Sequence, residues 1–139
     1  MNLLSIGTLA FDDIETPHGR AERIVGGSCT YITYAASYYA PSVQIVSVVG
    51  EDFPVEVLQD LQKRGADLSG IEVKHGEKSF FWAGRYHADM MGRDTLDTQL
   101  NVLADFNPQL PASYRQTPYV MLGNLTPTIQ MQVIDQMAT

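Results

Sequence analysis

The chain has 139 residues, of which 45% are hydrophobic and 18% charged, a composition typical of one globular domain and not of a disordered segment. Its net charge at pH 7 is −7, and its few lysines and arginines are scattered along the sequence. This charge balance excludes a basic surface for binding nucleic acid or an anionic membrane.

The sequence also indicates a compartment. Cys29 is the one cysteine, so no internal disulfide can form and a reducing environment is expected. The N-terminus has no basic region typical of a signal peptide, and no apolar run reaches the roughly 20 residues of a membrane span. We therefore expect a cytoplasmic protein with no membrane association.

The chain begins with a predicted strand and a predicted hairpin. The apolar run at 3–6, closed by Gly7, is typical of a buried parallel strand. Residues 11–25 are more polar and contain a turn at 16–19, which indicates a hairpin.

A helix is predicted next. Gly26–Gly27 precedes an Ala- and Tyr-rich stretch that extends to about Tyr39, where Pro41 stops it. Ser28 and Thr30 are the candidate caps of this helix.

A second strand and helix follow. Residues 43–49 are apolar on both faces and β-prone, as in a central strand. Asp52 is the expected N-cap of the next helix, Pro54 suits its first turn, and Gly65 ends it. Alternating strands and helices predict an α/β fold with a parallel sheet.

The middle of the chain predicts a second hairpin. Residues 78–86 and 95–102 are β-prone and are joined by a polar loop at 87–94. A hairpin of this kind is expected to project from the α/β body.

The last elements are a strand and a helix. Residues 119–122 predict another buried strand, which Gly123–Asn124 ends, and Thr126 and Pro127 are the expected N-cap and first turn of a helix. No strand follows to complete a further β-α-β unit, so we expect the chain to be truncated.

Four sequence features in a fixed order carry a family resemblance. They are Gly7-Thr-Leu-Ala-Phe-Asp12, then Gly26-Gly27, then Val46-Ser-Val-Val-Gly50-Glu-Asp52-Phe, and then Gly65-Ala-Asp-Leu-Ser-Gly-Ile71. This succession resembles the N-terminal half of the ribokinase-like (PfkB) carbohydrate kinase family, which includes nucleoside kinases.

The resemblance implies a three-layer, Rossmann-like α/β body with a parallel sheet and a small β-sheet lid. Residues 1–139 would be the N-terminal part of a single kinase domain, with lid excursions near 11–25 and 78–102. The intact protein would transfer the γ-phosphate of ATP to a hydroxyl of a sugar or nucleoside.

The family's catalytic segment, of the D-T-x-G-A-G-D type, lies in its C-terminal half, where ATP and Mg²⁺ also bind. The chain contains no such segment and no Walker A motif. We therefore expect no catalytic residue and no metal site in this chain, and no activity from it alone.

Asp12 is the first candidate for substrate binding. It follows the first strand at the carboxyl end of the sheet, where α/β proteins form ligand crevices. A carboxylate there can accept hydrogen bonds from two neighbouring sugar hydroxyls, which is the role of the matching aspartate in the family. The alternative is a loop aspartate that caps a local turn.

Gly26 and Gly27 are the next candidates, since glycines let the backbone approach a ligand and the helix behind them presents N–H groups. The alternative is a glycine pair needed only for a tight turn into the helix. Many family members have an asparagine where Tyr31 stands. Tyr31 either stacks on a ring, as in a nucleoside, or packs under the lid.

The second lid hairpin supplies the remaining candidates. Trp82, Gly84 and Tyr86 share one face of the predicted strand. Trp82 either contacts substrate or pairs lid against lid in a homodimer, as lids do in this family. Asn101, at the return to the body, could reach the site.

Other reactive side chains are interpreted as structural. Cys29 is expected to be a small buried residue, and His18, His75 and His87 have no metal-ligand spacing. The competing functional hypothesis is a non-catalytic sugar-binding or assembly module that lacks the ATP-binding half.

Overall fold

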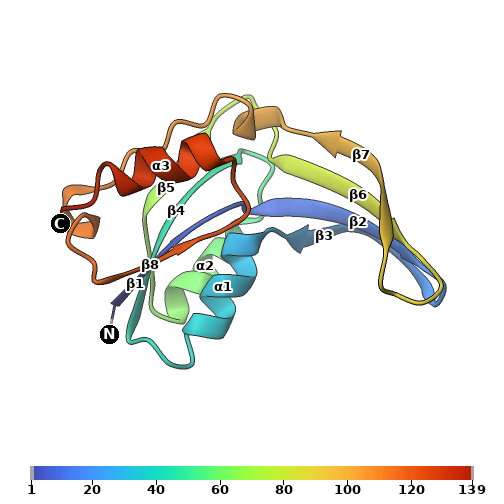
Figure 1. The fold of residues 1–139 in the computed structure, drawn as a ribbon, viewed down its shortest axis with the longest axis horizontal. Helices are drawn as coiled ribbons and strands as arrows, with labels where there is room; N and C mark the ends of the chain where they lie inside the picture. Colours follow the sequence, from blue (N-terminus) through green and yellow to red (C-terminus); the bar gives the residue numbers. More distant parts are fainter. Residues whose placement is uncertain (1, 139) are drawn as a thin grey trace.

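The computed structural model describes residues 2–138, which form an α/β body and a projecting β-sheet (Figure 1). The body sheet is parallel, with the strand order β5-β4-β1-β8. Its strands are β1 (Asn2–Ile6), β4 (Ser42–Gly50), β5 (Ala66–Lys74) and β8 (Tyr119–Leu122). The fold class expected from the sequence is therefore confirmed.

Helices cover both faces of this sheet (Figure 1). On one face lie α1 (Ser28–Ala36) and α2 (Val55–Lys63), and on the other lies α3 (Pro127–Ile134). The long connection from the lid to β8, with the 3₁₀ turns η1 (Asn101–Leu103) and η2 (Ala112–Tyr114), packs on the α3 side.

The core is divided by the sheet into two clusters. Ile45 and Val49 of β4 pack with residues of α1 and α2, whereas Val46 and Val48 pack with Tyr114 and with Val133 of α3. This arrangement explains why residues 43–49 have apolar side chains on both faces of the strand. The two polar residues among them, Gln44 and Ser47, are buried and form hydrogen bonds with Thr117 and with the carbonyl of Gly7.

The projecting sheet is formed by the two segments predicted as lid excursions, and we refer to it as the lid. Its strand order is β3-β2-β6-β7, with two antiparallel hairpins joined by the parallel pair β2–β6. Its strands are β2 (Ala10–Thr16), β3 (Gly19–Gly26), β6 (Phe80–Tyr86) and β7 (Arg93–Gln99). Both hairpins predicted from the sequence are confirmed, and they share one sheet.

Two cap predictions are wrong. The N-cap of α1 is Gly27, with no side-chain hydrogen bond, and Thr30 instead donates to the carbonyl of Gly26. The N-cap of α2 is Pro54, because the carboxylate of Asp52 is occupied by Ser79. The Thr126 cap is confirmed, since its hydroxyl accepts from the N–H of Ile129.

Two strand predictions also need correction. β5 (Ala66–Lys74) was not predicted from the sequence, and it pairs along β4 as an edge strand. β8 is not buried, since Tyr119 and Met121 are 53% and 49% exposed. Helix α1 ends at Ala36, before the expected Tyr39.

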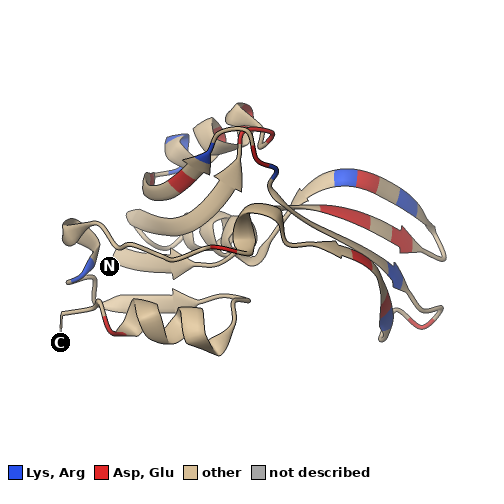
Figure 2. Ribbon diagram, turned by 90° about the horizontal axis from the view of Figure 1, so that it is seen from above, with Lys and Arg blue, Asp and Glu red and all other residues tan. Residues whose placement is uncertain are grey.

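Charged residues lie mainly on the lid and on α2, whereas β8 and α3 carry none (Figure 2). None of the helices in the described part of the chain combines the length and apolar character that crossing a bilayer requires.

The packing of α2 gives a test of the fold. Leu61 is fully buried against the sheet, whereas Val55 on the same helix is 58% exposed. Leu61→Ala should lower the free energy of unfolding of the intact protein by about 2–5 kcal/mol, because it leaves a cavity. Val55→Ala is the matched control and should change it by less than about 0.5 kcal/mol. Denaturant unfolding measures both, and equal effects would contradict the assigned helix face.

Candidate functional site

The order of strands in the body sheet reverses at β1, because β4 and β5 are added on one side of it and β8 on the other. β4 and β8 flank β1, and the helices that follow β1 and β8 lie on opposite faces of the sheet (Figure 1). Open α/β sheets bind ligands at such a switch point. The segments that follow β1 and β8 therefore mark the place to look for a site.

Three polar side chains meet at this point. The hydroxyls of Thr8 and Ser28 both donate to the Oδ1 atom of Asn124, the former over 3.0 Å. The N–H of Ser28 also donates to the hydroxyl of Thr8. These bonds join the ends of β1 and β8 to the start of α1.

A cavity of about 380 Å³ opens above these residues, between the strand ends and the lid. It is lined by Thr8, Ala10, Asp12, Gly27, Ser28, Tyr31, Phe80, Trp82, Tyr86, Arg93 and Asn124. Four residues singled out from the sequence, Asp12, Gly27, Tyr31 and Trp82, are thus brought together. Their contact with a substrate stays a prediction.

Asp12 supplies a carboxylate to the cavity. Burial of the side chain, followed by repulsion from Asp13, raises its pKa. Within residues 2–138, none of the hydrogen bonds found in the structure involves the Asp12 carboxylate. Its oxygens are therefore available to accept hydrogen bonds from a ligand.

Gly26 and Gly27 are both required by close packing. A Cβ on Gly26 would lie 1.9 Å from Oδ2 of Asp12. Gly27 has φ +92°, and a Cβ there would lie 2.3 Å from the carbonyl oxygen of Thr8. Gly26 does not line the cavity itself, but its lack of a side chain makes room for the Asp12 carboxylate.

The first N–H groups of α1 are less available to a ligand than the sequence indicated. The N–H groups of Ser28 and Cys29 donate to the hydroxyl and the carbonyl of Thr8. These two helix N–H groups are therefore used within the protein. Tyr31, one turn further on, is 59% exposed, and its hydroxyl donates to the carbonyl of Val25 in the lid.

The lid presents an aromatic face to the cavity. Trp82 and Tyr86 both line it, and a Cβ on Gly84 between them would lie 2.0 Å from the Trp82 indole. Trp82 Nε1 donates to the hydroxyl of Thr95, and the guanidinium of Arg93 lies 5.7 Å from the ring centroid. The opposite face of β6 carries Phe81, which packs against the core.

Asn101 lies in a different place. Its side-chain amide donates to the carbonyl of Ser79, and it lines a separate hollow at the back of the lid together with Arg23, Asp52 and Lys78. The structure therefore does not place Asn101 in the cavity that Asp12 lines.

An apolar hollow of about 360 Å³ continues from the polar cavity. The two share Thr8, Phe80 and Asn124. The apolar lining is given by Leu100, Leu103, Ala104, Leu125 and Ile129. A ligand with a polar end and a planar apolar end could occupy both.

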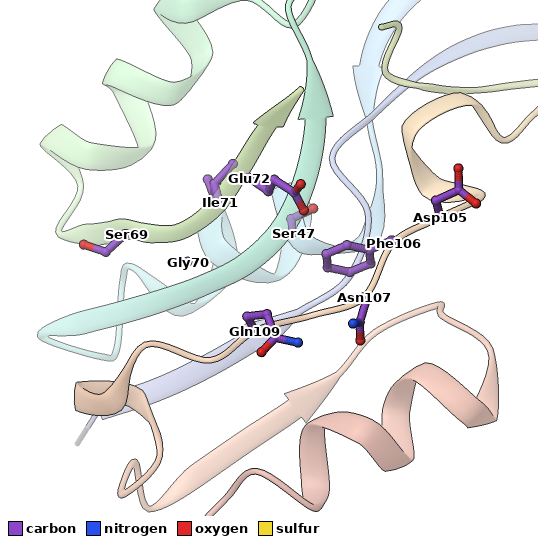
Figure 3. Close-up of a pocket in the computed structure, with 9 residues that line it drawn as sticks. All are labelled: Ser47, Ser69, Gly70, Ile71, Glu72, Asp105, Phe106, Asn107 and Gln109. Atoms are coloured by element: carbon purple, nitrogen blue, oxygen red, sulfur yellow. The ribbon is translucent and has the colours of Figure 1, made fainter. Parts of the chain in front are cut away.

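A further hollow of about 360 Å³ lies between β4, β5 and the connection to β8 (Figure 3). Its lining includes the carboxylates of Glu72 and Asp105 and the amides of Asn107 and Gln109, but no cationic residue. Within residues 2–138 there is no cluster of three or more His, Cys, Asp or Glu side chains that could hold a metal ion.

Cys29 is buried, as expected. Burial raises the pKa of its thiol to about 11, against smaller opposing effects of hydrogen bonds with Ser5 and Thr33. A protonated thiol in this position is a core residue and not a nucleophile.

Sequence reasoning missed Thr8, Ser28 and Asn124. Asn124 had a usable signal, since it directly follows a strand and a glycine at the carboxyl edge of the sheet. Thr8 and Ser28 had none, because their role depends on contacts between segments 20 and 96 residues apart.

Comparison with known proteins agrees with this architecture. A cytidine kinase of Thermococcus kodakarensis is 25% identical over 138 residues, which are 99% of this chain and 48% of that protein. The chain is thus similar to about half of a kinase of the ribokinase-like (PfkB) sugar and nucleoside kinase family. No protein-family model matches the sequence.

Solved structures of ribokinase-like kinases share the fold. A ribokinase of Cryptococcus neoformans, solved with ADP, superposes with a TM-score of 0.73 at 15% identity, over 94% of this chain and 44% of that one. A nucleoside kinase of Methanocaldococcus jannaschii gives 0.72 at 14% identity, over 97% and 48%. The chain thus spans about half the length of the relatives it matches.

Asp12 and Asp52 are expected to have opposite effects on how the free energy of unfolding depends on pH. Because the pKa of Asp12 is raised in the folded state, its ionisation opposes folding above its ordinary pKa of 3.8. Asp12→Asn should therefore stabilise the protein at pH 7, and the gain should begin to shrink as the pH falls to the raised pKa and should vanish below pH 3.8.

Asp52 is the matched comparison. Burial would raise its pKa, but hydrogen bonds from Ser79 and Arg23 outweigh burial and lower it. Asp52→Asn should destabilise the protein at pH 7, with the loss disappearing as the pH falls through the lowered pKa. Chemical denaturation at several pH values measures both, and effects of the same sign would contradict this assignment.

Proposed function

We propose that this chain is the acceptor-binding, N-terminal part of a kinase that transfers the γ-phosphate of ATP to a hydroxyl of a nucleoside or sugar. The observation that carries the proposal is the cavity at the switch point, where the free carboxylate of Asp12 faces an aromatic lid. The relationship to a cytidine kinase supports the same reaction class.

Each side chain has a chemical task in this proposal. Asp12 accepts hydrogen bonds from two neighbouring hydroxyls of the acceptor. Asn124 presents its amide beside them, held in orientation by Thr8 and Ser28. Trp82 and Tyr31 give the acceptor ring an aromatic surface, and the lid keeps water away from the reacting hydroxyl.

A nucleoside fits this arrangement better than a free sugar. The ribose hydroxyls would lie at Asp12, and the base would enter the apolar hollow beside Leu100 and Leu103. A free sugar would leave that hollow empty. It would therefore lose the favourable binding free energy that comes from burying the apolar lining.

ATP and Mg²⁺ would bind outside this chain. The described residues offer neither a glycine-rich phosphate loop nor an acidic cluster for the ion, so no step of phosphoryl transfer is assigned to them. Their contribution is to bind the acceptor, orient it and exclude water.

The exposed apolar side of β8 and α3 supports a larger protein over a self-contained module. Tyr119, Met121, Met131 and Ile134 are each at least 45% exposed there, and neither β8 nor α3 contains a charged residue. Monomeric proteins rarely leave such a patch open to solvent, so we propose that further polypeptide covers it.

Asp12 can be tested in the intact protein. Asp12→Ala should raise the KM for the acceptor by about 10- to 100-fold, the loss expected for charge-assisted hydrogen bonds, and leave the KM for ATP unchanged. Asp97→Ala, on the exposed strand β7, is the control and should change neither. An unchanged acceptor KM in Asp12→Ala would remove this residue from the site.

The choice between nucleoside and sugar has its own test. Leu100 is 50% exposed at the apolar hollow, so Leu100→Ser should not disturb the core. It should raise the KM for a nucleoside about 3- to 10-fold, for the loss of buried apolar area, and leave the KM for free ribose unchanged. Equal effects on both acceptors would contradict base binding in this hollow.

A further inference from the structure

The base of the lid has two faces. Ala10, Asp12, Phe80 and Trp82 line the acceptor cavity on one face. The other face carries Phe11, Asp13 and Phe81, because successive residues of a strand point to opposite sides. The structure of this second face has no part in the function proposed above.

Asp52 is the centre of contacts on the second face. Its Oδ1 atom accepts hydrogen bonds of 2.8 Å from both the N–H and the hydroxyl of Ser79, the residue before β6. Ser79 also accepts from the N–H of Gly50 and, through its carbonyl, from the amide of Asn101. The start of β6 and the chain after β7 are thereby fixed to the end of β4.

Gly50 lets these segments approach. A Cβ on Gly50 would lie 2.3 Å from the carbonyl oxygen of Glu77 and 2.7 Å from the nitrogen of Ser79. The second hairpin of the lid is therefore held by backbone packing as well as by hydrogen bonds.

On this face, the side chain of Arg23 connects the first hairpin to Asp52. Its Nη2 donates to Oδ2 of Asp52 over 3.0 Å, and its guanidinium lies 4.0 Å from the centroid of the Phe11 ring. The side chain of Asp52 is 22% exposed, so its carboxylate is better shielded than the carboxylates of the other ion pairs within residues 2–138.

Arg23 also shapes the strand that carries Asp12. It has φ +48° and belongs to a bulge, in which Glu22 and Arg23 of β3 lie opposite Asp13 alone. Its N–H donates to Oδ1 of Asp13 over 2.6 Å. Bulges re-aim neighbouring side chains, and the neighbour here is Asp12.

We propose that the Arg23–Asp52 ion pair latches the lid to the body and sets the direction of Asp12, so that both residues position the acceptor without touching it. This inference rests on the acceptor site proposed above. It adds that an ion pair holds the lid in place, on the face of the lid opposite the Asp12 carboxylate.

The test uses Arg23→Ala in the intact protein, with Arg85→Ala as the matched control. Arg85 is about as exposed as Arg23 and forms an ion pair with Glu15, but both of these residues lie within the lid. Arg23→Ala should raise the acceptor KM about tenfold, the scale of a small misplacement of a binding group, while kcat changes less than about threefold. Arg85→Ala should change neither.

A second readout does not depend on activity. Trp82 is the one tryptophan of these 139 residues and lines the cavity beneath the lid. With tryptophans elsewhere in the intact protein replaced by phenylalanine, Arg23→Ala should make Trp82 about twofold more accessible to acrylamide quenching, as a lid released by loss of its ion pair would. Arg85→Ala should leave the quenching unchanged.

These measurements separate the two proposals. Increased quenching in Arg23→Ala supports the latch even if neither nucleosides nor sugars are phosphorylated, an outcome that would overturn the kinase proposal alone. Unchanged quenching, or equal changes in the two variants, would overturn the latch. Arg23→Lys keeps the charge but loses the planar group over Phe11, and it should fall between wild type and Arg23→Ala.

Discussion

The close approach of two backbone segments at the end of β1 is the constraint on which the site depends. The turn at Gly26–Gly27 lies against the segment from Thr8 to Asp12, with no space for a Cβ at either glycine. This contact brings the start of α1 under the lid and leaves room for a carboxylate. It also couples the glycine pair to Asp12, so that the two sequence features form one structural unit.

The energetic character of the site follows from that packing. A carboxylate placed in a half-enclosed cavity beside a second acidic residue is destabilised, which is why its pKa rises. Functional sites commonly oppose stability in this way. The contacts that hold the lid are on the opposite face, where the lowered pKa of Asp52 shows that its charge is stabilised by Ser79 and Arg23.

Charged and apolar side chains are separated on the surface of the molecule. The lid is rich in charged side chains, as a solvated sheet requires, whereas β8 and α3 present apolar side chains without charge. Edge strands of this kind are usually covered or paired. The relatives that this chain matches are about twice its length, which supports the proposal that further polypeptide covers β8 and α3.

Local patterns determined much of this protein. The apolar runs predicted β1 and β4, the turn residues predicted both lid hairpins, and the glycine pair and Asp12 indicated where to look for an acceptor, because these signals depend on neighbours in sequence. Tertiary structure alone decided that Asp52 holds Ser79 instead of capping α2, and that Thr8, Ser28 and Asn124 meet at the switch point. It also placed Asn101 behind the lid, since hydrogen bonds between distant segments leave no periodic trace in a sequence.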